Sequence, residues 1–162
     1  MKTILLVYPG LGKTYAASKT NKVLEIQLSQ FENINVKKLG EHFPEHLKGV
    51  YEVEFCLDPD FPNNVINCIN KGFEDGRIPV MALKTSNIEF VTKHNFDFAF
   101  VVPASDKVEQ LKQQYIDRNN TESYIERNMK LLDKVAQDMP KYGKQIYYIH
   151  KDEHLLDLIN KL

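Results

Sequence analysis

The chain has little cysteine, little net charge and no long hydrophobic run, and each absence excludes a class of protein. Its two cysteines, Cys56 and Cys68, lack the spacing of a metal-ligand pair and are too few for a disulfide framework, so we expect reduced thiols. The formal net charge of −1 provides no basic surface for duplex nucleic acid or an anionic membrane. No apolar stretch has the length of a transmembrane helix or a signal peptide. The sequence therefore predicts a cytoplasmic protein.

A single domain with a real hydrophobic core fits the 162 residues, of which 43% are hydrophobic and 27% are charged. Five short apolar runs have the length and the β-branched or aromatic content of strands. They are Ile4–Tyr8, Val23–Leu28, Ile78–Leu83, Phe96–Val102 and Gln145–Ile149. The first and third runs are almost uninterrupted, as expected of strands that are covered on both faces of a parallel sheet.

Helical patterns separate these runs. They are expected over Lys13–Thr20, Asn63–Phe73, Asn87–His94, Lys107–Arg118, Glu122–Met139 and Glu153–Leu162. Thr121 is placed as the N-cap of the fifth helix. Strands that alternate with helices imply right-handed crossovers. The sequence therefore predicts an α/β fold with a five-stranded, parallel, doubly wound sheet flanked by helices.

Two segments of this single domain fall outside the plain alternation. Residues 31–62 are irregular, apart from a candidate strand at Val50–Phe55, and an insertion of this length is more often functional than accidental. We interpret residues 31–62 as a cap on the acceptor side of a site. Residues 107–139 contain two predicted helices joined by a short polar turn, and we interpret them as a helical lid.

The most specific motif follows the first predicted strand. The segment Pro9-Gly10-Leu11-Gly12-Lys13-Thr14 is a tight turn between a strand and a helix, which is the setting that a phosphate-binding P-loop requires. Gly10 and Gly12 allow backbone conformations that bring amide N–H groups close to a phosphate, and the following helix points its positive dipole end at the same anion. Lys13 supplies a charge for the terminal phosphates, and the Thr14 hydroxyl supplies a ligand for Mg²⁺. We therefore predict a P-loop NTPase that binds ATP and Mg²⁺.

The predicted nucleotide site consists of this loop and its neighbours. Its cofactor-binding residues are Pro9, Gly10, Leu11, Gly12, Lys13, Thr14 and Tyr15. Glu25 is the candidate for ordering Mg²⁺-bound water beside Thr14, and a solvated or helix-paired carboxylate is the alternative interpretation. The full P-loop pattern has a glycine where this chain has Val7, so a plain glycine-rich turn is a second alternative. The position of the turn after the first strand, where ligands bind in open α/β sheets, favours the P-loop.

A P-loop alone does not separate kinases from switch-type GTPases and motor ATPases. Those two classes usually have an apolar strand that ends in aspartate, and none of the predicted strands ends in this way. Small nucleotide kinases can rely on the P-loop and on lid arginines to stabilise the transferring phosphoryl group. The candidate catalytic residues are Lys13, Arg118 and Arg127. The alternative is a pair of surface helices whose arginines form ion pairs with neighbouring acids, namely Asp117, Glu122 or Glu126.

Four segments together give the chain a family resemblance. They are Tyr8-Pro9-Gly10-Leu11-Gly12-Lys13-Thr14, Val23-Leu24-Glu25-Ile26-Gln27-Leu28-Ser29-Gln30-Phe31, Asp58-Pro59-Asp60-Phe61-Pro62-Asn63, and Tyr115-Ile116-Asp117-Arg118 with the Thr121–Leu132 helix. In these segments the chain resembles the small P-loop nucleotide kinases of the nucleoside-monophosphate-kinase type, in particular short kinase-like proteins of bacteria and their phages. The resemblance implies Mg²⁺-dependent phosphoryl transfer from ATP to a nucleotide or a similar small acceptor, with Arg118 in the lid.

The chain also departs from that family. Members carry an acidic residue and a serine where this chain has Gln27 and Leu28, and often a histidine and an arginine after the third strand, where it has Lys84, Thr85 and Glu89. These departures leave two functions open. One is a kinase that acts on a nucleotide-like acceptor, and the other is a catalytically degenerate P-loop protein that binds or senses nucleotide without transferring phosphate.

Overall fold

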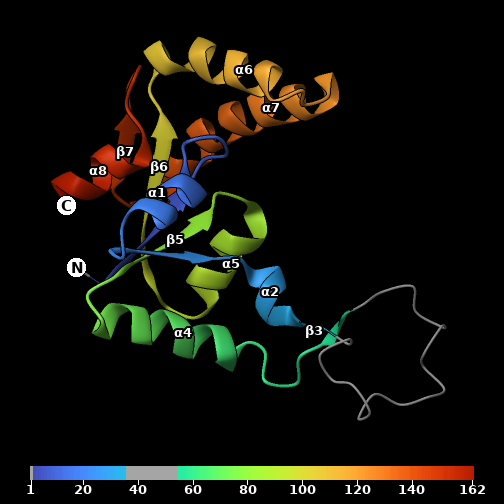
Figure 1. Ribbon diagram of the computed structural model, residues 1–162, viewed down its shortest axis with the longest axis vertical. Coiled ribbons are helices and arrows are strands. Elements are labelled where there is room, and N and C mark those ends of the chain that lie inside the picture. Colours follow the sequence, from blue (N-terminus) through green and yellow to red (C-terminus); the bar gives the residue numbers. More distant parts are fainter. Residues whose placement is uncertain (1, 36–54) are drawn as a thin grey trace. The chain divides into compact units, whose positions relative to one another are not determined.

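The computed structural model describes residues 2–35 and 55–162 (Figure 1). The chain forms two compact units. The larger unit consists of Met1–Glu25 and Gly72–Leu162, and the smaller unit is Ile26–Lys71.

A five-stranded parallel sheet is the centre of the larger unit. The strands lie in the order β2 (Val23–Ile26), β5 (Ile78–Ala82), β1 (Thr3–Val7), β6 (Asp97–Pro103) and β7 (Ile146–Ile149). Both ends of each strand lie within two residues of the ends of the run that predicts it. The α/β class and the five-stranded parallel sheet are therefore confirmed.

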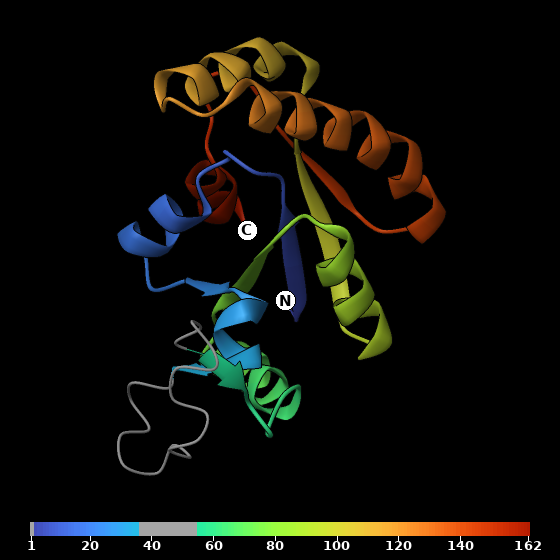
Figure 2. The ribbon, with the colours of Figure 1, turned by 90° about the vertical axis from the view of Figure 1, so that its right-hand side faces the viewer.

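The central strand β1 is apolar because the sheet is covered on both faces. Ile4, Leu5, Leu6 and Val7 are all completely buried. Figure 2 shows α1 (Lys13–Lys19) and α8 (Leu155–Lys161) on one side of β1 and β6, and α5 (Thr85–Lys93) on the other. Strands without a solvent-facing side read as continuous hydrophobic runs, as β1 does.

The strand order changes direction at β1 and β6. From β1 the chain continues to β2 at one edge of the sheet, whereas from β6 it continues to β7 at the other edge. The two strands are parallel neighbours, with Val7 opposite Val101, so their outgoing connections diverge at the carboxyl end of the sheet. Ligands of open α/β sheets bind at such a switch point.

The predicted helices are present with small shifts at their ends. They are α1, α4 (Asn63–Glu74), α5, α6 (Val108–Asp117), α7 (Glu122–Asp138) and α8. Thr121 caps α7 as predicted, because its hydroxyl accepts a 3.3 Å hydrogen bond from the Tyr124 amide. The prediction for α5 starts two residues late, because the Ile88 amide already donates to the Lys84 carbonyl.

The smaller unit contains elements that the sequence pattern did not predict. The strand expected over Val23–Leu28 ends at Ile26, and Leu28 begins the short helix α2 (Leu28–Glu32). A turn in which the Gln30 amide donates to the Gln27 carbonyl starts this helix. The strands β3 (Asn33–Asn35) and β4 (Phe55–Leu57) then pair in antiparallel fashion. The candidate strand Val50–Phe55 and the predicted cap 31–62 lie partly outside the described residues.

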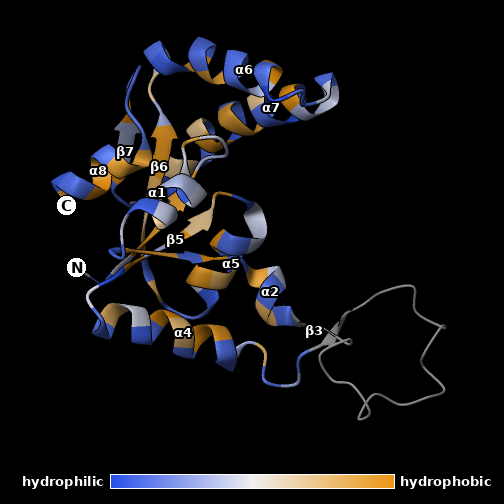
Figure 3. Ribbon diagram, viewed as in Figure 1, coloured by the Kyte–Doolittle hydropathy of each residue, from blue (hydrophilic) through white to orange (hydrophobic). Residues whose placement is uncertain are grey.

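The hydropathy of the larger unit follows this arrangement (Figure 3). Strands β5 and β6 are hydrophobic, whereas α6 and α7 carry hydrophilic residues between hydrophobic ones. Over the described ranges, no helix combines the length and the apolar character that crossing a membrane would require.

Candidate functional site

The connection from β1 to α1 has the backbone geometry that its glycines predict. Gly10 has a φ of 87° and Gly12 a φ of 91°, and residues other than glycine rarely adopt such positive values. The Ala16 amide donates to the Gly12 carbonyl at 2.8 Å and closes the first turn of α1. The loop therefore ends at the carboxyl edge of the sheet, where the connections of β1 and β6 diverge.

Three of the predicted site residues converge beside this loop. Lys13 and Thr14 start α1, and Glu25 comes from β2. The Lys13 Nζ atom lies 3.5 Å from Glu25 Oε1, and the Thr14 hydroxyl donates to the same oxygen at 3.3 Å. The Glu25 side chain is only 14% exposed, so this carboxylate is not solvated, and its contacts with the first two residues of α1 match the helix-paired alternative.

The pair of Thr14 and Glu25 has suitable chemistry for Mg²⁺. Hydroxyl and carboxylate oxygens are the donors this ion prefers, and it is commonly bound by one or two such groups together with phosphate oxygens and water. Within the described ranges, no group of three or more His, Cys, Asp or Glu side chains is placed to hold a metal.

Leu11 and Tyr15 occupy different surroundings from one another. Leu11 is completely buried, main chain included, so in this structure it presents no surface to a nucleotide. Its carbonyl accepts a 3.0 Å hydrogen bond from the Leu155 amide, which ties the loop to the start of α8. Tyr15 is 52% exposed, and the His154 ring lies beside it at 6.4 Å.

Gly10 has a second role that its motif does not predict. A Cβ atom at this position would stand 2.6 Å from Leu111 Cδ1 and 3.0 Å from Tyr115 Cε1. The space beside Gly10 is therefore filled by α6 and not by solvent. By contrast, a Cβ atom at Gly12 would meet only Tyr15 Cβ, at 3.9 Å.

Two buried tyrosines connect the loop to the helices α6 and α7. The Tyr8 hydroxyl donates to the Asn128 carbonyl of α7, and the Tyr115 hydroxyl of α6 donates to the Pro9 carbonyl at 2.7 Å. Burial raises the pKa of both phenols well above the ordinary range. Sequence reasoning missed these contacts, because the hydrogen-bonded residues are more than a hundred positions apart.

The predicted lid is a helix pair that is anchored at its base. The inner sides of α6 and α7 are buried at Leu111, Tyr115 and Val135. Arg118 lies exposed at the carboxyl end of α6. Figures 1 and 2 show the pair lying across the carboxyl end of β6. Closure of this pair over a ligand stays a prediction.

The two arginines are not held by the neighbouring acids that the sequence offers. In the described part of the chain, neither Arg118 nor Arg127 forms an ion pair, and Asp117 instead accepts a 2.8 Å hydrogen bond from Gln113. The Arg127 guanidinium lies over the Tyr124 ring, 5.4 Å from its centroid. The alternative of arginines paired along the helix surface is therefore not observed.

A buried lysine fixes the connection from β6 to α6. The Lys107 Nζ atom donates to the Glu153 carbonyl at 2.7 Å and to Gln110 Oε1 at 3.0 Å. Removal from water lowers the pKa of this amine. Lys107 thereby joins the segment after β6 to the segment after β7. Sequence reasoning had placed this lysine at the start of a surface helix.

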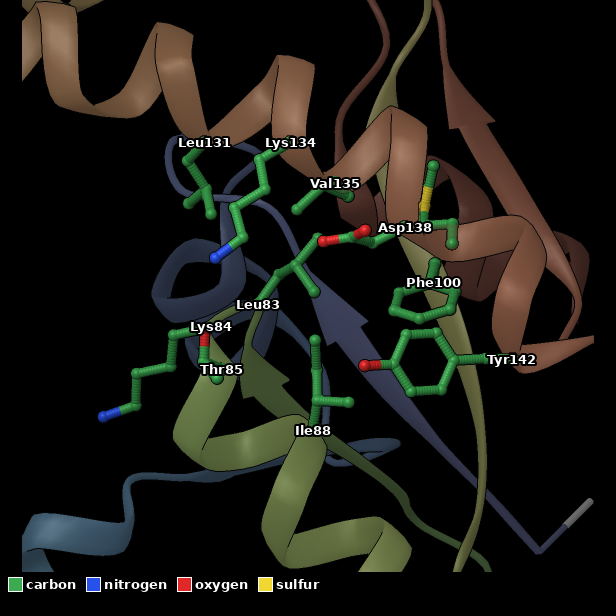
Figure 4. A pocket seen from close by; sticks show the side chains of 11 residues that line it. Leu83, Lys84, Thr85, Ile88, Phe100, Leu131, Lys134, Val135, Asp138 and Tyr142 are labelled. Carbon is green, nitrogen blue, oxygen red and sulfur yellow. The ribbon is translucent and has the colours of Figure 1, made fainter.

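A small pocket of about 80 Å³, partly open to solvent, lies between α5 and α7 (Figure 4). Apolar and polar side chains both line it. The apolar residues are Leu83, Ile88, Phe100, Leu131, Val135 and Met139, and the polar or charged residues are Lys84, Thr85, Lys134, Asp138 and Tyr142. Figure 4 shows the Tyr142 hydroxyl pointing toward Ile88. Since the Leu83 amide donates to the Val7 carbonyl at 2.8 Å, one end of the pocket adjoins the strand that leads into the loop.

One buried polar atom near this end of β5 lacks a partner. Asn87 is 1% exposed, and its Nδ2 atom donates to the Ala82 carbonyl at 2.7 Å. This bond fixes the orientation of the amide, so the other atom is an acceptor. Among the described residues, Asn87 Oδ1 has no hydrogen-bond partner.

The geometry has to carry the functional assignment. No protein-family model matches the chain, and no curated protein matches it either.

Proposed function

We propose that the chain is a Mg²⁺-dependent P-loop kinase that transfers a phosphoryl group from ATP to a nucleotide or a similar small acceptor. The observation that carries this proposal is the convergence of Lys13, Thr14 and Glu25 beside a loop whose two glycines have positive φ. This group lies at the switch point between β1 and β6, where α/β sheets bind their ligands. A plain glycine-rich turn has no need for a lysine, a hydroxyl and a carboxylate at one point.

Each residue has a definite role in this proposal. The loop amides and Lys13 hold the phosphates of ATP, and Thr14 is a ligand of the Mg²⁺ ion. Bound Mg²⁺ neutralises charge on the phosphate oxygens. Glu25 is placed to order water on that ion. Arg118, with Arg127, stabilises charge on the transferring group from the side of the helix pair.

The contact between Lys13 and Glu25 favours ATP that carries Mg²⁺ over metal-free ATP. The Glu25 carboxylate is the partner of Lys13, at 3.5 Å. A phosphate without a metal would meet the charge of Glu25 and would compete with it for Lys13. ATP that carries Mg²⁺ brings a cation for the carboxylate, so both pairings are satisfied together.

The pocket between α5 and α7 is our candidate for the acceptor site. Its apolar side chains suit a flat ring, and the Lys134 amine on its lining suits an anionic group. A nucleoside monophosphate has both features.

The experiment is a transfer assay with ATP labelled on its terminal phosphate. Nucleoside monophosphates are supplied one at a time with Mg²⁺, and labelled diphosphate product is measured. The kinase predicts Mg²⁺-dependent transfer to one or a few of them, with at least about a tenfold loss on Lys13→Ala. Transfer that survives this substitution unchanged would contradict the role of the loop.

A second candidate is a nucleotide-binding protein without transfer. The position of Arg127 over the Tyr124 ring favours it, because the guanidinium is already engaged by an aromatic side chain. This candidate predicts that Mg²⁺-ATP raises the melting temperature while no acceptor becomes phosphorylated. Turnover of ATP with any nucleoside monophosphate would eliminate it.

A further inference from the structure

We infer that Tyr8 and Tyr115 are positioning residues that set the distance between the phosphate loop and the arginines of the helix pair. This inference rests on the proposed kinase function, because it gives the two tyrosines a role in that reaction. Neither phenol needs to touch a ligand. Each acts through the element that it holds.

Both hydrogen bonds connect the segment Tyr8–Pro9 to the helix pair α6 and α7. Tyr8 comes from the end of the strand that leads into the loop, and its hydroxyl donates to Asn128 on α7. Tyr115 comes from α6, and its hydroxyl donates to Pro9 in the loop at 2.7 Å. Each part therefore supplies one donor and one acceptor. A shift of the loop relative to the helices would break both bonds together.

The surroundings of these bonds leave little room for adjustment. Tyr8 is completely buried and Tyr115 is 1% exposed. Between them, Gly10 is packed so closely that a single added carbon would stand 2.6 Å from Leu111. Asn128 is itself fixed, because its Nδ2 atom donates to the Tyr124 carbonyl at 2.9 Å. Closely packed groups of this kind have one arrangement and do not deform continuously.

The residues that are held in this way adjoin the charged groups of the proposed site. Arg127 precedes Asn128 in the chain, and Arg118 follows Tyr115 by about one turn of helix. On the other side, Pro9 lies four residues before Lys13. The two tyrosine hydrogen bonds thus connect the segment that carries the ATP-binding lysine to the helices that carry the arginines. A misplacement of about 1 Å in such a constellation can cost about a hundredfold in rate.

The plain alternative is that the tyrosines only stabilise the core. In that case the loss of a hydroxyl lowers stability and affects every activity to the same extent, whatever the arginines are. If the tyrosines act through the arginines, their effect depends on the arginines being present. A double-mutant cycle separates the two cases.

The cycle compares Tyr8→Phe and Tyr115→Phe in two backgrounds, the natural chain and the chain with Arg118→Ala and Arg127→Ala. The assay measures kcat and KM for Mg²⁺-ATP with the nucleoside monophosphate that accepts phosphate from the natural chain. In the natural background we expect each substitution to lower kcat about tenfold while KM for Mg²⁺-ATP changes less than about twofold. In the arginine-free background we expect less than about a twofold further change in kcat.

Tyr124→Phe is the matched control. Its ring packs edge-on against Tyr115 at 5.6 Å, and its hydroxyl has no hydrogen-bond partner within the part of the chain that the structure describes. We expect its kcat to stay within about twofold of the natural chain in both backgrounds. Circular dichroism and thermal unfolding establish that each variant is folded at the assay temperature.

Each remaining outcome decides the question. Equal losses of kcat in both backgrounds would overturn the inference and leave the kinase proposal intact. A natural chain that binds Mg²⁺-ATP but phosphorylates no acceptor overturns the inference together with the transfer reaction, since the arginines then have no reaction to act on. A natural chain without Mg²⁺-ATP binding overturns the proposed function itself, and the inference falls with it.

Discussion

Gly10 lies directly against Leu111: a Cβ atom built on the glycine would stand 2.6 Å from the Leu111 Cδ1 atom. This contact connects the most specific motif of the sequence to a helix one hundred residues further along the chain. The glycine is needed both for its positive φ and for its lack of a side chain. The loop and the helix pair therefore depend on one another for their conformation.

The first prediction concerns that contact. Gly10→Ala adds a carbon to a filled space and imposes an unfavourable φ, so we expect it to lower the free energy of unfolding by about 2–4 kcal/mol. Gly76→Ala is the matched control, because Gly76 has a φ of 70° but nothing within 4 Å of the added carbon. It should cost only about 1 kcal/mol. Urea denaturation measures both, and equal losses would show that packing against Leu111 contributes nothing.

The second prediction concerns Glu25 and the metal. Glu25→Gln removes the charge that faces the phosphates and releases Lys13, so metal-free ATP should bind more tightly, by about threefold or more. In the presence of Mg²⁺ the same substitution should weaken ATP binding, because the carboxylate no longer helps to hold the ion. Calorimetric titration with and without Mg²⁺ measures both effects. Asp97→Asn is the control. It removes a carboxylate at the start of β6 that pairs with Lys144, and it should change neither affinity.

The third prediction concerns alkaline pH. Burial holds the pKa of Tyr8 and Tyr115 above the ordinary value of 10.0 in the folded chain. Above about pH 10 the unfolded state loses these protons and the folded state keeps them, so the stability present below pH 10 declines as the pH rises toward the folded-state values. Each tyrosine contributes a slope of about 1.4 kcal/mol per pH unit.

This slope can be measured directly. Urea denaturation at several pH values above 10 should show a smaller loss of stability for the Tyr8→Phe and Tyr115→Phe double variant than for the natural chain. An unchanged slope in the double variant would mean that both phenols ionise freely in the folded state.

The fourth prediction concerns the exposed arginine between the two helices. Arg118→Ala should lower kcat about a hundredfold while KM for Mg²⁺-ATP changes little, because the guanidinium acts on charge that develops during transfer. The substitution should change the free energy of unfolding by less than about 0.5 kcal/mol, since Arg118 forms no ion pair with another described residue. Lys112→Ala, an exposed cation on the same helix, should leave kcat unchanged. Equal effects of the two substitutions would indicate a general charge effect.

Much of the fold could be predicted because its signals are local. The run Ile4–Tyr8 is apolar because β1 is covered on both faces, and Thr121 could be placed as a cap because its hydroxyl bonds to an amide three residues away. The helix α2 was missed because it has five residues and directly follows a strand that reads as continuous with it. Short elements carry too few residues for a periodic pattern.

The site was predictable only in part, because only some of its residues are close to one another in the sequence. Gly10, Gly12, Lys13 and Thr14 are adjacent in sequence and form a recognisable motif, and Glu25 could be proposed from its place near the second strand. The bonds from Tyr8 to Asn128 and from Tyr115 to Pro9 could not be predicted, because nothing local distinguishes these tyrosines from ordinary core residues. Long-range packing decided their partners.

Binding of Mg²⁺-ATP by the natural chain and by Lys13→Ala, measured by calorimetry, tests the central claim most directly. Lys22→Ala is the control, because Lys22 is an exposed lysine outside the loop. A P-loop predicts saturable binding to the natural chain, at least about a tenfold weaker affinity for Lys13→Ala, and an unchanged affinity for Lys22→Ala. Absence of binding to the natural chain, or equal affinities for the natural chain and Lys13→Ala, would contradict it.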